Sequence, residues 1–309
     1  MQYDTDLYPT RGEVERIRQR PDPVVYGSGA RQSPHGLDAV QIESYKKNGY
    51  LVFPKLFALQ ESARLLQEAG RLSDSPDLQE REELIQLPDS NAIQTIFGQH
   101  KLSKVFDRLS RDCRILDKVT QLLGGPSYIH NGRIIIDPVF QEAHQETTPA
   151  WHSGFETWHA EDGIPRCRMV VGWLMLSANN EFSDPLHLIP ESHNKFVSCA
   201  GWTDEDHFKY SSYNKKYGIP SENAVLDLLS RNGLARINGA PGTLVLFDGN
   251  MMHNSPDNIS PSPRANLLFV YNSVDNQPED IPFGAAKPRP EYLRNTDTTP
   301  LQPTENNFT

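Results

Sequence analysis

Residues 243–272 read Thr-Leu-Val-Leu-Phe-Asp-Gly-Asn-Met-Met-His-Asn-Ser-Pro-Asp-Asn-Ile-Ser-Pro-Ser-Pro-Arg-Ala-Asn-Leu-Leu-Phe-Val-Tyr-Asn. Two apolar runs, 243–247 and 266–272, are bounded by Gly, Pro, Asn and Asp, which is typical of short β-strands joined by turns. His253 follows the first run, and Arg264 opens the second. The stretch therefore predicts a histidine and an arginine at the ends of strands in one β-rich unit.

The same pattern extends back along the chain to about residue 127. Further short apolar runs lie at 133–136, 167–176 and 186–189, with turn-forming residues between them. Several short strands separated in this way are the signature of a sandwich or a barrel. One helical insertion is expected near 221–231, where apolar residues recur at helical spacing.

The first half of the chain has helical periodicity instead. Asp38 is a suitable N-cap for a short helix, and two longer helical patterns lie near 56–72 and 113–123. We expect a single domain over 1–309 with four parts. These are an irregular N-terminal arm (1–36), a helix-rich buttress (37–126), the β-core (127–276) and a polar, proline-bearing tail (277–309).

Composition excludes several classes of protein. Of the 309 residues 37% are hydrophobic, and no apolar run approaches the length that spans a bilayer, so no membrane partner is expected. The formal net charge of −10 argues against a nucleic-acid partner. Three scattered cysteines and the absence of a secretory signal at residue 1 predict a cytoplasmic protein. A small-molecule substrate is expected, and a homodimer is possible.

The segment richest in reactive side chains is 151–163, Trp-His-Ser-Gly-Phe-Glu-Thr-Trp-His-Ala-Glu-Asp-Gly. If this segment is a strand, its alternation places His152, Gly154, Glu156 and Trp158 on one face. A histidine would then lie beside a position that has no side chain.

These features resemble the iron(II)- and 2-oxoglutarate-dependent oxygenases of the phytanoyl-CoA hydroxylase superfamily, and among them the ectoine hydroxylases most closely. The resemblance covers most of the chain, including the matching segments 22–25, 48–52, 128–130, 155–159, 188–193 and 269–274. It implies a double-stranded β-helix, a relative of the jelly roll, with flanking helices.

The resemblance also implies a set of site residues. His152 and His253 would be the iron ligands, and Arg264 would bind the distal carboxylate of 2-oxoglutarate. An arginine suits this role because its planar guanidinium can donate two parallel hydrogen bonds to a carboxylate. Ser255 matches a hydroxyl position that would add one more hydrogen bond.

The chain departs from this family at the third iron ligand. The usual triad is His-x-Asp with a distant His, whereas this chain has His152-Ser153-Gly154. Non-haem iron halogenases carry Ala or Gly at this position, and chloride takes the place of the acid. We therefore expect a halogenase that uses iron(II), 2-oxoglutarate, O2 and chloride. Gly154 would leave open the iron coordination position that chloride occupies.

Five other interpretations compete with the halogenase. A glycine in a strand is usually a bulge or a close-packing position. The chain could also be a hydroxylase altered or engineered at the acidic ligand, or one that recruits Glu156 as its third ligand. Outside catalysis, it could be a binding or sensor protein without turnover, or a purely structural protein without iron.

His159, His187 and His193 are expected to be structural residues.

The substrate positions also differ from the ectoine enzymes. Where those enzymes have Gln-Ser-Arg-Ile-Asn-Tyr-Lys, residues 131–137 read Asn-Gly-Arg-Ile-Ile-Ile-Asp. Because these changes alter which hydrogen bonds a pocket can make, we expect a substrate other than ectoine. An amino acid, a nucleoside, a nucleotide or another small polar metabolite all fit. Asn131, Trp158 and Phe269 are the expected substrate-binding residues.

Overall fold

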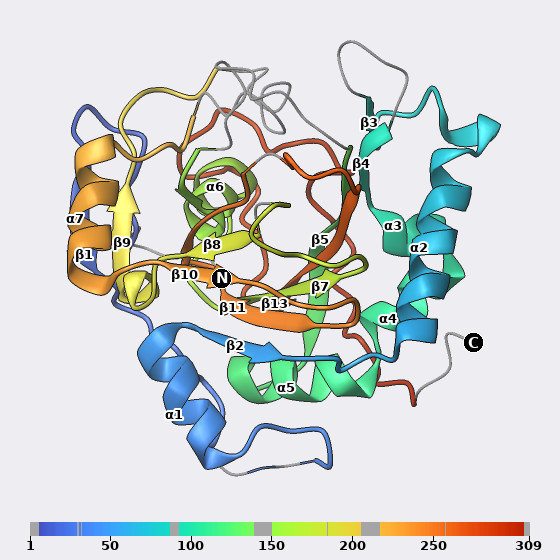
Figure 1. Cartoon of the computed structure of the whole chain (residues 1–309). Coiled ribbons are helices and arrows are strands. Elements are labelled where there is room, and N and C mark those ends of the chain that lie inside the picture. Colours follow the sequence, from blue (N-terminus) through green and yellow to red (C-terminus); the bar gives the residue numbers. More distant parts are fainter. Residues whose placement is uncertain are drawn as a thin grey trace.

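The computed structural model describes residues 6–29, 31, 33–86, 93–138, 150–183, 185–204, 217–256 and 258–305. Within them the strands form three antiparallel sheets (Figure 1). The large sheet has the order β2 (Tyr50–Phe53), β11 (Leu244–Asp248), β7 (Met169–Met175), β13 (Arg264–Ser273), β5 (Ser127–Asp137), β4 (Ile93–Phe97), β3 (Leu84–Gln86). The second has the order β10 (Ala235–Ile237), β8 (Leu186–Leu188), β12 (Met252–Asn254), β6 (His152–Ser153), and the third pairs β1 (Arg16–Gln19) with β9 (Lys195–Ser198).

The two larger sheets share an apolar core, which we call the inner cluster. It contains Trp173 and Phe247 from the large sheet together with Leu186 and Leu188 from the second sheet. Alternation along β13 explains the division of side chains, because Leu268 and Val270 belong to the inner cluster while their neighbours face the other way. The site described below lies at one end of this core.

The other face of the large sheet is covered by helices. Its apolar side chains form an outer cluster with those of α1, α2, α4 and α5. The helices in chain order are α1 (Ala39–Asn48), α2 (Leu59–Ser73), α3 (Gln99–Leu102), α4 (Lys104–Ser110), α5 (Cys113–Leu123), α6 (Gly154–Asp162) and α7 (Glu222–Asn232), with 3-10 turns at Pro76–Leu78 and Ser192–Asn194. Figure 1 shows α2 and α4 beside the β3–β5 edge and α5 below β2.

Local sequence signals place the predicted helices correctly. The Asp38 carboxylate accepts a hydrogen bond from the Gln41 backbone N–H at 2.8 Å, which begins α1. Gly49 ends the helix with φ at 79°, a conformation that a glycine adopts without strain. The helices predicted near 113–123 and 221–231 are likewise confirmed as α5 and α7.

The segment 152–158 is not a strand throughout, so the alternation considered for it does not apply. Only His152 and Ser153 are extended, as β6, and α6 begins at Gly154. The Ser153 hydroxyl accepts a hydrogen bond from the Glu156 backbone N–H, so Ser153 is the N-cap of α6. The pattern Ser-x-x-Glu is a capping signal, and it prevails over the alternation of the side chains. Gly154 and Trp158 are consequently one helical turn apart.

Both ends of the chain pack on α6. Arg11 of the N-terminal arm contacts Glu161 at 2.8 Å, and Arg289 of the C-terminal tail contacts Asp162 at 2.6 Å. Burial alone would raise the pKa of Asp162, but Arg289 and His130 outweigh it and lower that pKa to about 2. The helix is therefore held in place by ion pairs from segments remote in the sequence.

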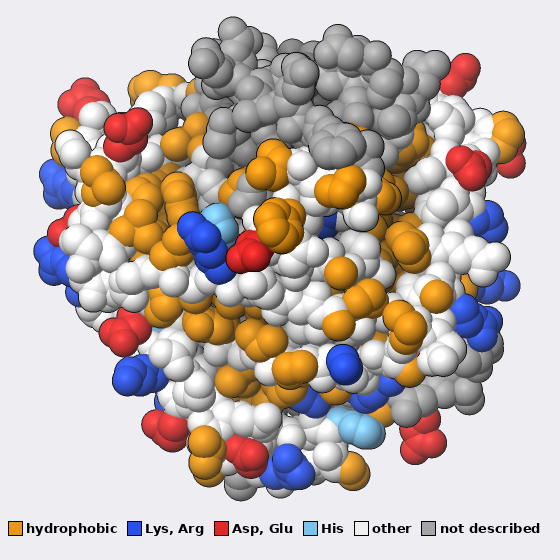
Figure 2. Space-filling view, viewed as in Figure 1, with side chains coloured by type: hydrophobic (Ala, Val, Ile, Leu, Met, Phe, Trp, Pro, Cys, Tyr) orange, Lys and Arg blue, Asp and Glu red, His pale blue; other side chains and the backbone are white. Residues whose placement is uncertain are grey.

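The surface is mixed in character. On the face shown in Figure 2, side chains of both charges lie around the margin, and apolar side chains lie between them. Across the residues that the structure describes, no helix combines the length and the apolar character needed to cross a bilayer.

Candidate active site

Two histidines meet on the last two strands at one edge of the second sheet. His152 in β6 and His253 in β12 are directly opposite each other in the antiparallel pairing of these strands. Their ring centroids are 4.3 Å apart. The structure thus brings together the two residues that the sequence predicts as metal ligands, although 101 positions separate them in the chain.

Both imidazole rings are oriented by backbone carbonyls. Nδ1 of His152 lies 2.9 Å from the Ala150 carbonyl oxygen, and Nδ1 of His253 lies 2.9 Å from the Met251 carbonyl oxygen. A carbonyl only accepts, so Nδ1 carries a proton and donates in both rings, and in the neutral form of each ring the lone pair is on Nε2. Metal-binding histidines are held in this way by a hydrogen bond from their second nitrogen. The pair fits a metal ion as two of its ligands.

Within the described part of the chain, no group of three or more His, Cys, Asp or Glu side chains is placed to hold a metal. The Glu156 carboxylate instead receives hydrogen bonds from Arg11 Nε at 2.7 Å and from the Thr10 hydroxyl at 2.7 Å. The alternative in which Glu156 replaces the missing acid therefore disagrees with the structure, because that carboxylate is bound to Arg11.

Gly154 is in close contact with Trp158. A Cβ atom at Gly154 would lie 2.5 Å from Cη2 and 2.9 Å from Cζ2 of the Trp158 indole. The indole belongs to the inner cluster and is only 8% exposed, so it has little room to move. The glycine therefore has a packing role, as in the close-packing interpretation of the sequence.

This contact predicts that Gly154→Ala lowers the free energy of unfolding by about 1–3 kcal/mol, the usual cost of overpacking a core. The atoms that collide belong to the six-membered ring of the indole, which phenylalanine lacks at those positions. In a Trp158→Phe background the same alanine should be nearly neutral. Urea unfolding of the two single variants and the double variant measures the coupling. Equal costs of the alanine in both backgrounds would contradict the packing role.

Arg264 is buried beside its cross-strand partner Asp137. The guanidinium donates from Nε to Asp137 Oδ2 at 2.9 Å, from Nη1 to the Ser183 carbonyl at 2.7 Å and from Nη2 to the Pro256 carbonyl at 2.7 Å. Burial raises the pKa of Asp137, although Arg264 opposes the shift. Ser255 precedes Pro256, so the two residues predicted to bind 2-oxoglutarate lie in one neighbourhood.

The three predicted substrate residues do not converge. Trp158 lies in the inner cluster, whereas Phe269 lies in the outer cluster under the helices. Phe269 is therefore on the face of β13 opposite to Leu268, away from the cluster that contains Trp158. The reason is the β13 register, in which Arg264, Leu268 and Val270 share one face.

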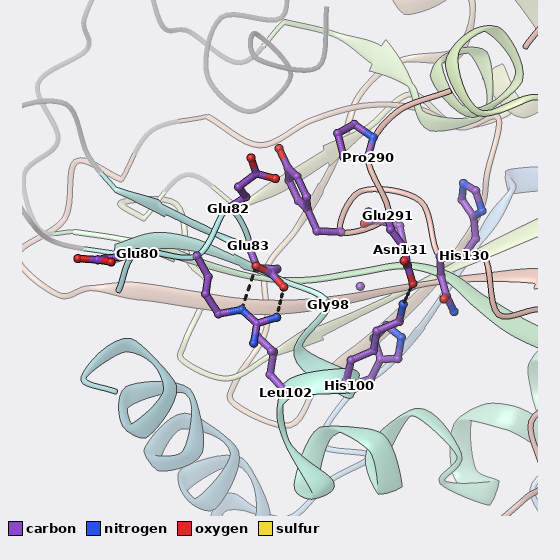
Figure 3. Close-up of a pocket in the computed structure, with 15 residues that line it drawn as sticks. Glu80, Glu82, Glu83, Gly98, His100, Leu102, His130, Asn131, Pro290 and Glu291 are labelled. Carbon is purple, nitrogen blue, oxygen red and sulfur yellow. Dashed lines mark hydrogen bonds and ion pairs between the residues drawn. The ribbon is translucent and has the colours of Figure 1, made fainter. Parts of the chain in front are cut away.

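Asn131 lines a separate pocket of about 630 Å³, shown in Figure 3. Neither predicted metal ligand is among the described residues that line it. The Asn131 amide donates to the Leu293 carbonyl at 2.7 Å. His100 also lines this pocket, and burial lowers the pKa of His100 to about 4. Among the residues that line this pocket, Arg81 pairs with Glu83, and Lys101 with Glu291 (Figure 3).

The sequence argument missed Phe247, whose ring centroid is 5.3 Å from that of His253. A signal was present, because alternation within the predicted strand 243–248 places Val245 and Phe247 on one face, and both belong to the inner cluster. Two of the three histidines expected to be structural contact the backbone: His159 bonds the Ile164 carbonyl at 2.8 Å and His193 bonds the Lys46 carbonyl at 3.0 Å.

Comparison with known proteins decides the family. The family model described as "Phytanoyl-CoA dioxygenase (PhyH)" matches residues 45–266, which is more than half of the chain. The chain belongs to the phytanoyl-CoA dioxygenase family. The expected superfamily of iron- and 2-oxoglutarate-dependent oxygenases is thereby confirmed.

Curated relatives of this family member are named ectoine dioxygenase. The protein from Bordetella parapertussis is 42% identical over 289 residues, 93% of this chain and 92% of the relative. The protein from Sphingopyxis alaskensis is 40% identical over the same length and covers the same shares. The protein from Streptomyces coelicolor is 38% identical over 298 residues, 96% of this chain and 97% of the relative.

Solved structures of EctD from S. alaskensis share the fold. The apoform has a TM-score of 0.86 at 35% identity and covers 99% of this chain and 100% of its own. The structure described with 2-oxoglutarate and 5-hydroxyectoine has a TM-score of 0.87 at 36% identity, with the same coverage. A third is described with bound Fe, at a TM-score of 0.86, 34% identity and the same coverage. The expected mainly β core, a double-stranded β-helix with flanking helices, is confirmed.

The prediction of a halogenase is wrong. Relatives that match more than nine-tenths of this family member are named ectoine dioxygenase, and EctD is among the solved structures that it matches over 99% of its length. These comparisons support the alternative interpretation, a hydroxylase altered at the acidic iron ligand. They give no support to chloride as a cofactor or to Gly154 as a chloride vacancy, and the contact with Trp158 gives Gly154 a structural reason instead.

Proposed function

We propose that this chain is a hydroxylase that uses iron(II), 2-oxoglutarate and O2 to oxidise a small polar molecule, and that it is related to the ectoine dioxygenases. The observation that carries this proposal is the cross-strand pair of His152 and His253, each with Nδ1 bonded to a carbonyl. The relatives at about 40% identity support the same chemistry. Small-molecule recognition and a possible homodimer belong to this proposal.

His152 and His253 would hold the metal through Nε2, and Arg264 with Ser255 would bind the distal carboxylate of 2-oxoglutarate. When bound, the metal and the co-substrate supply the oxidising power, as 2-oxoglutarate loses CO2 to give succinate while one oxygen atom enters the substrate. The carbonyls of Ala150 and Met251 keep both imidazoles in one tautomer and one orientation. Phe247 and Trp158, both in the inner cluster, exclude water from this end of the core.

An anaerobic titration tests the proposal directly. Iron(II) and 2-oxoglutarate are added to the protein, and the visible charge-transfer absorption of the metal is followed. An absorption band that needs both components is expected. Absence of metal binding would favour a structural protein, and binding without any decarboxylation of 2-oxoglutarate across a substrate panel would favour a binding or sensor protein.

The substrate panel includes ectoine, amino acids, nucleosides and nucleotides, with products followed by mass spectrometry. The differences at 131–137 lead us to expect that ectoine is not the substrate. Asp137 is the most consequential of these differences because it contacts Arg264. Stoichiometric hydroxyectoine would contradict this expectation but would leave the proposed reaction type intact.

Replacing Arg264 with leucine should weaken 2-oxoglutarate binding by about tenfold to a hundredfold, since charge-assisted hydrogen bonds contribute about 1.5–3 kcal/mol. Affinity for iron should change far less. Arg264→Lys is the matched control, because it keeps the charge and loses the planar fork, and it should bind 2-oxoglutarate with intermediate affinity. The anaerobic titration gives both affinities. Unchanged co-substrate affinity in Arg264→Leu would overturn the role of Arg264.

A further inference from the structure

Arg264 already has a carboxylate partner within the chain. Asp137 and Arg264 are register partners on β5 and β13, and their side chains are only 9% and 2% exposed. Asp137 Oδ2 lies 2.9 Å from Nε and 2.8 Å from Nη2 of Arg264. Where the ectoine hydroxylases have a lysine, this chain thus has an acid bound to the arginine that the proposed function assigns to 2-oxoglutarate.

The contacts of Arg264 leave little capacity for a second carboxylate. A guanidinium has five N–H donors: one on Nε and two on each terminal nitrogen. Nε contacts Asp137, Nη2 contacts both Asp137 and the Pro256 carbonyl, and Nη1 contacts the Ser183 carbonyl. Four of the five donors are therefore directed at protein oxygens, which leaves one. Bidentate binding of a carboxylate needs two donors.

We propose that Asp137 is a positioning residue that sets the affinity for 2-oxoglutarate, because it holds Arg264 in place and competes with the co-substrate carboxylate for the guanidinium. The inference rests on the proposed function. Binding of the co-substrate requires Asp137 to release at least one N–H of Arg264.

Charge leads to the same conclusion. The Asp137–Arg264 pair is neutral as a unit, and its other two described partners are uncharged carbonyl oxygens. An incoming carboxylate thus meets a buried arginine whose charge is already compensated, and burial makes an additional uncompensated charge costly. Asparagine at 137 removes the competing charge while it keeps the size and one oxygen acceptor.

Asp137→Asn should therefore tighten 2-oxoglutarate binding by about tenfold, because a neutral acceptor forms weaker hydrogen bonds to a guanidinium than a carboxylate does. Affinity for iron(II) should stay within about twofold, because Asp137 is not paired with either histidine. Both values come from the anaerobic titration, and calorimetry with metal-free protein gives an independent affinity for 2-oxoglutarate. Unchanged or weaker co-substrate binding in a folded Asp137→Asn protein would overturn the proposal.

Two controls separate competition from a merely structural role. Asp137→Glu keeps the charge and should not tighten binding. Asp22→Asn removes another buried carboxylate, which pairs with Arg166 at 2.5 Å, and should leave the affinity for 2-oxoglutarate unchanged. If Asp22→Asn tightened binding to the same extent, the effect would come from general loosening and the proposal would fail.

The unmodified protein provides a test that does not depend on folding of a variant. In a crystal structure with iron and 2-oxoglutarate, Asp137 Oδ2 should no longer contact both Nε and Nη2 of Arg264. Retention of both contacts, with the co-substrate bound, would overturn the proposal. If the unmodified protein and Asp137→Asn both failed to bind 2-oxoglutarate at all, the proposed function itself would be wrong, which is a different outcome.

Discussion

Replacing His253 with alanine is expected to weaken iron(II) binding by more than about a hundredfold. Loss of a residue that only hydrogen-bonds to a metal ligand lowers metal affinity by about 10–100-fold, and loss of the ligand itself should lower it further. His152→Ala should have an equal effect, because the two rings face each other across β6 and β12 at 4.3 Å. Anaerobic calorimetry or equilibrium dialysis with iron(II) measures the loss. The visible absorption band with 2-oxoglutarate should disappear in both variants.

His187→Ala is the matched control for these variants. His187 lies in β8 next to β12, and its ring stacks on Trp151 at a centroid distance of 6.4 Å. Its Cα partner in that pairing is Asn254, the residue after His253. The control should retain iron affinity within a few-fold. Normal iron binding by His253→Ala would show that the metal, if bound, lies elsewhere.

Replacing Arg11 with alanine should lower the free energy of unfolding by about 3–5 kcal/mol, the usual cost of removing one partner of a buried ion pair. Arg11 pairs with Glu156 at 2.7 Å and with Glu161 at 2.8 Å, and these side chains are at most 4% exposed. The variant would remove the Arg11 guanidinium from two buried carboxylates, of which Glu161 keeps Arg289 at 3.9 Å. Urea unfolding at neutral pH measures the change.

Arg231→Ala provides the comparison for this loss. Arg231 pairs with Asp227 at 2.7 Å on the surface of α7, with side-chain exposures of 69% and 39%. Exposed pairs of this kind contribute at most about 1 kcal/mol. If Arg11→Ala cost no more than Arg231→Ala, the anchoring of α6 by the N-terminal arm would be refuted.

Local signals in the sequence were sufficient for much of the fold. The caps at Asp38 and Gly49 define α1 without reference to the rest of the chain. The short apolar runs between turn residues became β5, β7, β8, β11 and β13, with bounds that differ by a few residues. Each of these elements depends on its own residues and on one buried face, so periodicity is enough to find them.

The sequence is not sufficient where two local signals conflict, or where the pairing register of two strands determines which face a side chain lies on. At 152–158 the alternation of side chains competed with the Ser153 cap, and the cap prevailed. Phe269 could be assigned to a face only once the pairing of β13 with β5 was known. The Asp137–Arg264 contact depends on that same pairing, and the two residues are 127 positions apart.

At the site, the resemblance to a family identifies the two histidines and Arg264 as candidates, whereas only the structure shows which groups surround them. The carbonyls that orient the imidazoles belong to the residue two positions before each histidine, and no sequence pattern marks such a contact. The missing acid at Gly154 led to the incorrect prediction of a halogenase, whereas the contact of Gly154 with Trp158 depends on the helix that begins there.

The attachment of both chain ends to α6 has a consequence for the order of folding. Arg11 reaches Glu156 across 145 positions, and Arg289 reaches Asp162 across 127. Contacts between residues so distant in sequence carry a large loop-closure entropy and form slowly. During synthesis the helix that follows His152 has to wait for Arg289 to leave the ribosome before its ion pairs are complete. We therefore expect α6 to be among the last elements to become ordered, after the strands on which the two histidines meet.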